Sequence, residues 1–195
     1  VQTISYLPYF ISWVVAANLV IAALSPEGGI VNEVLMFLGI IDQPVLWLGV
    51  PRYFWWIIVF SDMWKNVGWN AIIYLSAMTS IDPELYEAAS IDGAGRLKRI
   101  WHITLPGIKP VFIVLLVMNL GWILNAGFEH QLLLMNPVVR EVAEVIDIFV
   151  LRYGMNMGRY SFATAAGIFK SVVSIIMLAA ANFIVKKLND GEELL

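Results

Sequence analysis

Four long apolar runs restrict the possible folds of this chain more than any other feature of its sequence. A helix needs about 20 apolar residues to cross the hydrocarbon core of a bilayer, which is roughly 30 Å thick. Peptide groups in lipid must be hydrogen-bonded within the protein, and a helix satisfies them locally. Only 14% of the residues are charged, compared with about 25% in soluble domains. We therefore predict an all-α, polytopic transmembrane bundle that forms a single domain over residues 1–195, with spans at about residues 6–24, 54–78, 106–128 and 160–184.

Composition excludes several kinds of site. The sequence has no cysteine, so it offers no disulfide and no thiolate metal ligand. Its net charge of −3 provides no basic surface for nucleic acid. It contains no Gly-x-x-x-x-Gly-Lys-Ser/Thr phosphate loop, no His-Glu-x-x-His and no Gly-x-Ser-x-Gly. We expect no cofactor, no metal ion, no nucleic-acid partner and no catalytic residue, so the chain is not predicted to be an enzyme.

The segment between the second and third apolar runs, residues 82–106, is polar and carries a fixed pattern. Asp82-Pro83-Glu84 has the N-cap, first-turn proline and acid that begin a helix, which we expect to reach about Ser90. Glycines at 93 and 95 allow a reversal, and a second short, basic helix is predicted over Arg96–His102. The pattern itself is Glu87-Ala88-Ala89, three residues, Gly93, nine residues, Ile103, one residue, and Leu105-Pro106.

This spacing resembles the EAA loop in the permease subunits of ATP-binding-cassette (ABC) importers. Most of the rest of the chain is similar to permeases of carbohydrate importers of the maltose type, in the branch for alginate and other complex polysaccharides. The similarity is carried by YLPYFISWVV, SDMWKNVGWNAIIYL and NAGFEHQLLLMNPVVREVAEVIDIFVLRYG. It implies the MetI-like fold of type I importers, which has six spans against the four predicted here. No basic segment precedes the first apolar run, so we expect no signal peptide and a start inside a longer protein.

The resemblance also implies a function and a set of partners. The chain is expected to form the path for a sugar or oligosaccharide across the bacterial cell membrane, beside a second permease subunit that is identical or different. Two cytoplasmic ATPase subunits are expected to drive it, and an extracellular solute-binding protein to deliver the sugar. By the same resemblance, the residues that contact the ATPase are Glu87, Ala88, Ala89, Gly93, Ile103, Leu105 and Pro106.

Basic residues near the span ends indicate the orientation, because cytoplasmic segments are enriched in lysine and arginine. The 82–109 segment and the C-terminal end share six of them, Arg96, Lys98, Arg99, Lys109, Lys186 and Lys187. The opposite side has four, Arg52, Arg140, Arg152 and Arg159. The bias predicts that the EAA-like loop and the C-terminus are cytoplasmic.

Polar residues within the predicted spans are candidates for the sugar path. Asp62 and Lys65 would each cost about 2.5–3.5 kcal/mol at mid-bilayer, so they should face the bundle interior or water. Lys170 lies at a similar depth, and Asp62 can pair with either lysine, as a structural ion pair or as part of a gate. Aromatic faces and amides suit a sugar, although a tryptophan near a span end is more often an interfacial anchor and one within a bundle more often serves packing. The full candidate set is Asp62, Trp64, Lys65, Asn70, Asn119, Trp122, Asn125 and Lys170.

Three further segments have recognisable patterns. Residues 30–41 place apolar side chains on one helical face and are too short to span, which predicts a helix at the membrane surface. The 129–159 segment contains a predicted amphipathic helix with Val142, Val145, Ile146 and Phe149 on one face. Ala163, Gly167 and Ser171 recur every four residues, a pattern typical of helix interfaces.

Several alternatives to sugar import remain open. One is an ABC importer permease for another solute, such as a glycerol phosphate, an amino acid or a polyamine. Another is a channel or ion-coupled carrier that uses Asp62 and Lys65 as a proton relay. A third is an intramembrane enzyme, but the only histidines in the sequence, His102 and His130, form no recognisable catalytic motif.

Overall fold

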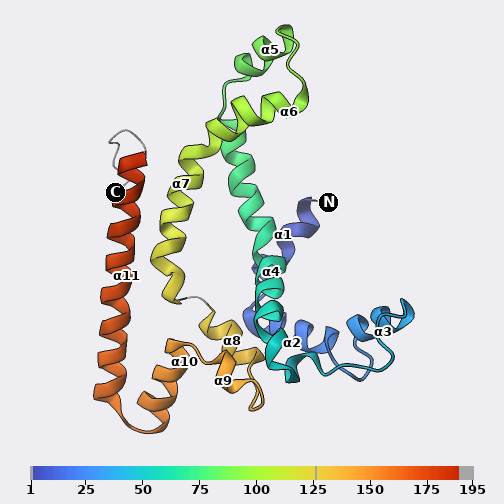
Figure 1. The fold of residues 1–195 in the computed structure, drawn as a ribbon, viewed down its shortest axis with the longest axis vertical. Helices are drawn as coiled ribbons and strands as arrows, with labels where there is room; N and C mark the ends of the chain where they lie inside the picture. Colours follow the sequence, from blue (N-terminus) through green and yellow to red (C-terminus); the bar gives the residue numbers. More distant parts are fainter. Residues whose placement is uncertain (1, 126, 189–195) are drawn as a thin grey trace. The chain divides into compact units, whose positions relative to one another are not determined.

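The computed structural model describes residues 2–125 and 127–188, and it describes only the backbone of Gln2, Thr3, Trp122, Asn125, Ile184, Lys187 and Leu188. The described backbone is helical and contains no strand (Figure 1). The chain divides into two compact units, Val1–Trp69 with Asn125–Gly167 and Asn70–Leu124 with Ile168–Leu195. Two long helices, α4 (Pro51–Thr79) and α11 (Tyr160–Leu188), run from one unit into the other.

The first unit contains mostly short helices around the beginning of α4. Besides the start of α11, its elements are α1 (Gln2–Phe10), α2 (Trp13–Ala23), α3 (Ile30–Phe37), η1 (Trp47–Gly49), α8 (Phe128–Leu134), α9 (Arg140–Ala143), α10 (Ile146–Leu151) and η4 (Arg152–Asn156). The amphipathic helix predicted around Val142, Val145, Ile146 and Phe149 is not continuous, because α9 ends at Ala143 and α10 begins at Ile146.

The first predicted span differs from the structure. Residues 6–24 form the parts of two helices, because α1 ends at Phe10, α2 begins at Trp13, and the two are bent by 117°. Ser12 starts α2 as its N-cap, where its hydroxyl accepts a hydrogen bond from the backbone N–H of Val15 at 3.3 Å. Such a cap satisfies a free donor of the new helix, so the break after Phe10 is locally stabilised.

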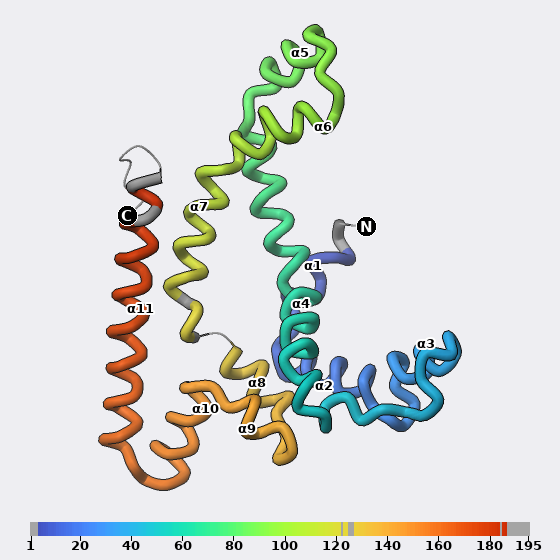
Figure 2. The backbone as a smooth tube through the Cα atoms, viewed as in Figure 1, coloured from blue at the N-terminus to red at the C-terminus, as the bar shows by residue number. Residues whose placement is uncertain are grey.

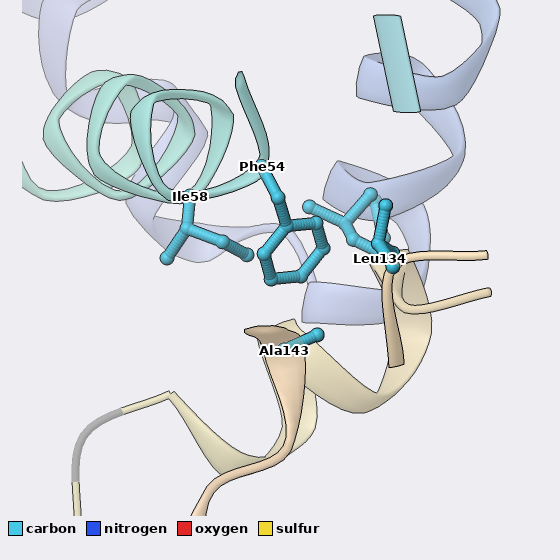
Figure 3. Packing of buried hydrophobic residues seen from close by; sticks show 6 residues of the cluster. Phe54, Ile58, Leu134 and Ala143 are labelled. Carbon is cyan, nitrogen blue, oxygen red and sulfur yellow. The ribbon is translucent and has the colours of Figure 1, made fainter. Parts of the chain in front are cut away.

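The core of the first unit lies where α2, α4, α8 and α9 meet (Figure 3). Phe54 is fully buried and packs in a cluster with Ala17, Ile58, Leu134, Val139 and Ala143. Small alanines on α2 and α9 allow the backbones to approach the phenylalanine ring closely. This cluster brings together segments that are about 120 residues apart in the chain, so the contact depends on tertiary packing alone.

Asn32 organises the segment that contains α3. It is 1% exposed, and its side chain donates to the carbonyls of Ser25 and Val45 and accepts from Val45 N–H and Trp47 Nε1 at 2.9–3.1 Å. All four capacities of the amide are thus used. With Asn32 turned inward, α3 exposes Ile30, Val34 and Phe37. α3 is shorter than the predicted helix over 30–41, and its apolar face is on the surface of the unit.

The second unit contains the end of α4, α5 (Pro83–Ile91), α6 (Arg96–Arg99), η2 (Ile100–Thr104), α7 (Leu105–Trp122), the beginning of η3 (Ile123–Asn125) and most of α11. Its core is the contact between α7 and α11, where Val117, Ala181 and Val185 are buried.

Length and composition allow two of the described helices to cross a membrane, Arg96–Gly121 and Tyr160–Phe183. The bent pair Ile4–Phe10 and Trp13–Ala23 makes a third if it counts as one span. Although α4 has 29 residues, it is not among them, and its middle carries Asp62, Lys65 and two asparagines.

Candidate functional site

The first half of the EAA-like loop is the helix α5, whose beginning matches the sequence prediction. The carboxylate of Asp82 accepts a hydrogen bond from the N–H of Glu84 at 2.9 Å, and Pro83 occupies the first turn. The cap satisfies a free N–H group at the helix start, and proline loses nothing there because its missing N–H would have no partner.

Gly93 ends α5 and turns the chain. Its φ angle is 72°, in the left-handed region that glycine adopts without the steric penalty of a Cβ. The N–H of Ala94 donates to the carbonyl of Ala89 at 2.8 Å, and the N–H of Gly93 donates to the carbonyl of Ser90 at 3.1 Å. This pair of bonds is a Schellman motif, which satisfies the last carbonyls of a helix. The glycine of the pattern is therefore required by the backbone.

Two side-chain hydrogen bonds brace α5 against the segment that follows the turn. The hydroxyls of Tyr86 and Thr104 are 3.0 Å apart, and Nη1 of Arg99 donates to Oγ of Ser90 at 3.0 Å. Sequence reasoning did not select these four residues, because none belongs to the EAA pattern. We call the braced unit of residues 82–104 the elbow.

The second arm of the elbow and the third predicted span belong to one helical segment, which bends between α6 and α7 (Figure 2). The sequence suggested a separate basic helix over Arg96–His102 and a new span that opens at Pro106. In the structure, α6, η2 and α7 form one helix over Arg96–Gly121, with a π-helical turn at Ile100–Thr104. Pro106 lies in the first turn of α7. Proline cannot donate the usual helical hydrogen bond. The wider π turn just before Pro106 accommodates this missing bond.

One face of α5 is open to solvent. Glu84, Glu87, Ala88 and Ile91 recur at helical spacing, and all four are exposed, Ile91 by 88%. Ala89 is half-buried on the side that faces the second arm. The two alanines of the pattern therefore differ, because Ala88 is exposed beside Glu87 while Ala89 is half-buried.

The remaining residues of the pattern lie on the second arm. Ile103 is half-buried, whereas Leu105 and Pro106 are exposed. A hollow of about 740 Å³ lies between the arms and is lined by Tyr86, Arg96, Leu97, Arg99, Ile100 and Thr104. The exposed face of α5 thus presents an acid, a small residue and an apolar residue.

The sugar-path candidates are distributed over both units of the chain. Asp62, Trp64 and Lys65 belong to the first unit, and Asn70, Asn119 and Lys170 belong to the second. The side chains of Trp122 and Asn125 lie outside the described residues. Asp62 is exposed and accepts a hydrogen bond from Asn66 at 2.9 Å. Asn119 is also exposed and donates to the carbonyl of Leu115 within its own helix.

Lys65 is buried, and it does not pair with Asp62. It is 5% exposed, and its ammonium donates to the backbone carbonyls of Pro8, Tyr9 and Ile11. The three-residue spacing of Asp62 and Lys65 suggested a pair on one side of α4, but the lysine turns toward the break between α1 and α2.

A second buried polar group was missed by sequence reasoning. His130 on α8 lies 2.8 Å from Oγ of Ser61 on α4, and its ring stacks on Trp13 with centroids 4.0 Å apart. The Ser61 hydroxyl donates to the carbonyl of Ile57, so Nε2 of His130 carries the proton and donates to Ser61. Burial lowers the pKa of His130 to about 4, against a smaller opposing effect of Asp62. The histidine is therefore neutral at physiological pH and joins three helices.

Comparison with known proteins identifies the class to which this architecture belongs. The model of one protein family, the binding-protein-dependent transport system inner membrane component, matches residues 1–190. The chain belongs to this family.

Proteins similar to this chain include transport proteins for polysaccharides. A polygalacturonan/rhamnogalacturonan transport system permease protein of Bacillus subtilis, YteP, is 45% identical over 193 residues, which cover 99% of this chain and 59% of that protein. A crystal structure of a bacterial ABC transporter involved in the import of the acidic polysaccharide alginate contains a chain that is 46% identical, with a TM-score of 0.91 over 95% of this chain and 64% of that one.

A bacterial alginate ABC transporter was also solved in complex with an alginate pentasaccharide-bound periplasmic protein. Its matching chain has a TM-score of 0.92 at 46% identity, over 96% of this chain and 64% of that chain. These matches confirm the predicted permease fold. The chain spans about three fifths of the length of the relatives that it matches.

Proposed function

We propose that this chain is the membrane-spanning permease part of an ATP-driven importer and forms a translocation path for a sugar or oligosaccharide. The observation that carries the proposal is the elbow, whose exposed Glu87–Ala88 face is braced against an arm that continues as α7. An ATPase that moves this face moves α7 with it, because α5 is hydrogen-bonded to the second arm, which continues into α7. The chain itself then supplies no catalytic group, and hydrolysis belongs to the ATPase.

The proposed partners follow from the family and from the elbow. Two ATPase subunits bind on the cytoplasmic side, one at the elbow of this chain and one at that of a second permease subunit. Glu87 accepts hydrogen bonds from the ATPase, and Ala88 allows close approach because its side chain is small. A solute-binding protein docks on the opposite side of the membrane. The elbow and the C-terminus are cytoplasmic, in agreement with the excess of basic residues there.

The proposed cargo is an oligosaccharide derived from a polysaccharide. Support comes from the relatives, whose names include polygalacturonan, rhamnogalacturonan and alginate. Asp62, Trp64, Asn70, Asn119, Trp122, Asn125 and Lys170 remain proposed contributors to the path. Lys65 is the weakest candidate for direct sugar contact, since its three donors are already bound to carbonyls.

The coupling role of the elbow is tested by the substitution Glu87→Gln, which keeps the size of the side chain and removes its charge. Hydrogen bonds to charged groups contribute about 1.5–3 kcal/mol, so we expect roughly a tenfold or greater loss of sugar-stimulated ATP hydrolysis in the reconstituted complex. Membrane insertion should be unchanged, because the side chain is exposed.

Glu84→Gln is the matched control, since it removes another exposed acid of α5 one turn earlier. It should retain most of the stimulated hydrolysis. If Glu87→Gln has full transport and full stimulation, the proposed contact with the ATPase is wrong. The substrate class is tested separately by uptake of labelled oligouronides and neutral oligosaccharides with the cognate binding protein, with and without ATP. Uptake that survives ATP depletion would favour an ion-coupled carrier instead.

A further inference from the structure

The break between α1 and α2 creates a local shortage of hydrogen-bond donors. The last carbonyls of any helix have no partner within that helix, and in a membrane an unsatisfied peptide group is costly. α1 ends at Phe10, and the following residues turn by 117° into α2. The carbonyls of Pro8, Tyr9 and Ile11 therefore form an electronegative end, which carries the negative pole of the helix dipole.

Lys65 of α4 supplies the missing donors. Its Nζ lies 3.2 Å from the carbonyl oxygen of Pro8 and 2.8 Å from those of Tyr9 and Ile11. An ammonium has three N–H donors, so the number of donors equals the number of acceptors. The charge lies against three dipoles that point their negative ends at it, which is the arrangement that stabilises a buried cation.

Aromatic rings form the other walls of this site. Nζ lies 5.5 Å from the ring centroid of Tyr9 and 5.1 Å from that of Trp13, distances at which ring faces attract a cation. Trp69 stacks on Tyr9 at 4.5 Å, and His130 stacks on Trp13 at 4.0 Å. Each wall is thus supported by a second ring and is held in place.

The approach of α1 to α4 is also built into the sequence. Gly68 lies one turn after Lys65, and a Cβ at this position would be 2.0 Å from the carbonyl oxygen of Ser5. Glycine therefore lets the backbone of α1 lie directly on α4. This close contact keeps the carbonyl end of α1 within reach of Nζ.

We propose that the carbonyl end of α1, with the rings of Tyr9 and Trp13, is a monovalent-cation site that the chain fills with its own ammonium. When the lysine is truncated, the site binds a small primary ammonium ion from solution. The aromatic walls select an ammonium over a hydrated alkali ion, and a tethered cation cannot leave with a transported solute. The inference does not depend on the proposed function, since it concerns how this chain holds its broken helix.

The test compares variants of the complete transporter with its partner subunits, purified in nanodiscs, by thermal unfolding. We expect Lys65→Ala to lower the melting temperature by several degrees, and ethylammonium chloride to restore at least half of the loss. Tetramethylammonium chloride at equal ionic strength should not restore it, because that ion has no N–H donor. Lys65→Met should lose stability without recovery, since its stem occupies the space of the added ion.

Lys109→Ala is the control for general salt effects, because it removes an exposed lysine and should respond to both salts as the unmodified protein does. Unchanged stability in both Lys65 variants, recovery that is equal in the two salts, or no recovery in ethylammonium would each overturn the proposal.

A second measurement covers the case in which Lys65→Ala does not assemble. The amount of assembled complex in membranes is compared for Lys65→Arg and Lys65→Met, which have long side chains with and without a cation. We expect several-fold more complex with arginine. Equal amounts would show that the charge is irrelevant and would overturn the proposal.

Discussion

Gly93 is a single residue on which the fold of the elbow depends. Its positive φ angle allows the two hydrogen bonds that close α5 and sends the chain back toward Thr104. Gly95, only two residues later, has a φ angle of −68°, which any residue adopts, and open space around its Cβ position. The two glycines therefore have different requirements although they look alike in the sequence.

The substitution Gly93→Ala should destabilise the elbow by roughly 1–2 kcal/mol, the usual cost of a left-handed conformation for a residue with a Cβ. Hydrogen exchange of residues 83–99 in the assembled complex measures the effect, and stimulated ATP hydrolysis should fall with it. Gly95→Ala should change the local stability by no more than about 0.5 kcal/mol. Equal effects of the two substitutions would contradict this account of the turn.

His130 provides a pH-dependent contribution to stability. Burial lowers its pKa from 6.5 to about 4, whereas the unfolded chain binds a proton near pH 6.5. Between these values the unfolded state binds more protons than the folded state, so the free energy of unfolding falls as the pH decreases from 6.5 to about 4. Above pH 6.5 the buried neutral ring contributes its full stability.

Thermal unfolding of the assembled complex between pH 4 and 7 measures this dependence. The substitution His130→Phe keeps a ring against Trp13 and removes the titrating group, so the fall in melting temperature across this range should become smaller. An identical pH profile in the variant would mean that other groups are responsible.

At the scale of elements, the close crossing of α1 and α4 requires a residue without a side chain, Gly68. A Cβ at Gly68 would lie 2.0 to 2.6 Å from backbone atoms of Ser5 and Tyr6. Backbone atoms cannot move aside as a side chain can, so α1 as a whole would have to shift. The shift would also draw the carbonyls of Pro8 and Tyr9 away from Lys65.

The substitution Gly68→Ala should therefore destabilise the first unit by about 1–3 kcal/mol, as overpacking commonly does. Gly121→Ala in α7 is a suitable comparison, because the nearest atom to its Cβ position is Leu178 Cδ1 at an ordinary 3.5 Å. Replacement of a helical glycine without a clash stabilises by about 0.5–1 kcal/mol. Melting temperatures should thus change in opposite directions, and a stable Gly68→Ala variant would refute the close crossing.

At the scale of the whole molecule, apolar side chains are exposed in a way that suits a membrane protein. α11 exposes Ile168, Phe169, Val172, Ile175 and Ile176, and none of the residues in its apolar window is buried inside the chain. In water such a face would favour aggregation. In a bilayer it contacts lipid or another subunit without that cost. The long exposed helices are thus consistent with a chain that completes its packing outside itself.

The substitution Val172→Lys places a charge near the middle of the helix Tyr160–Phe183, where insertion costs about 2.5–3.5 kcal/mol. Phe162→Lys lies near the end of the same helix, and a lysine there reaches the interface with its long stem. We expect a several-fold lower yield of inserted protein for Val172→Lys and little change for Phe162→Lys, as measured in membrane fractions. Similar yields would argue against a mid-membrane position for Val172.

The sequence by itself determined the helical class and the beginning and end of α5, because periodicity, caps and turn residues act between neighbours a few positions apart. It indicated a reversal at Gly93 and Gly95, but only the structure showed that Gly93 alone of the two has a left-handed backbone. It also indicated the permease family through the spacing from Glu87 to Pro106. It did not predict the break after Phe10, since a run of apolar residues does not distinguish a straight helix from two bent ones.

Tertiary structure decided where the buried polar groups find their partners. From the sequence, Asp62 can pair with Lys65 or with Lys170. In the structure, the ammonium of Lys65 instead binds carbonyls 54 to 57 positions away in the chain. His130 meets Ser61 across 69 positions. Such partners depend on which helices cross and at what distance, and that is set by packing at positions such as Gly68. The local sequence pattern determines each helix separately, whereas the partners of a buried charge are determined only by how the helices pack together.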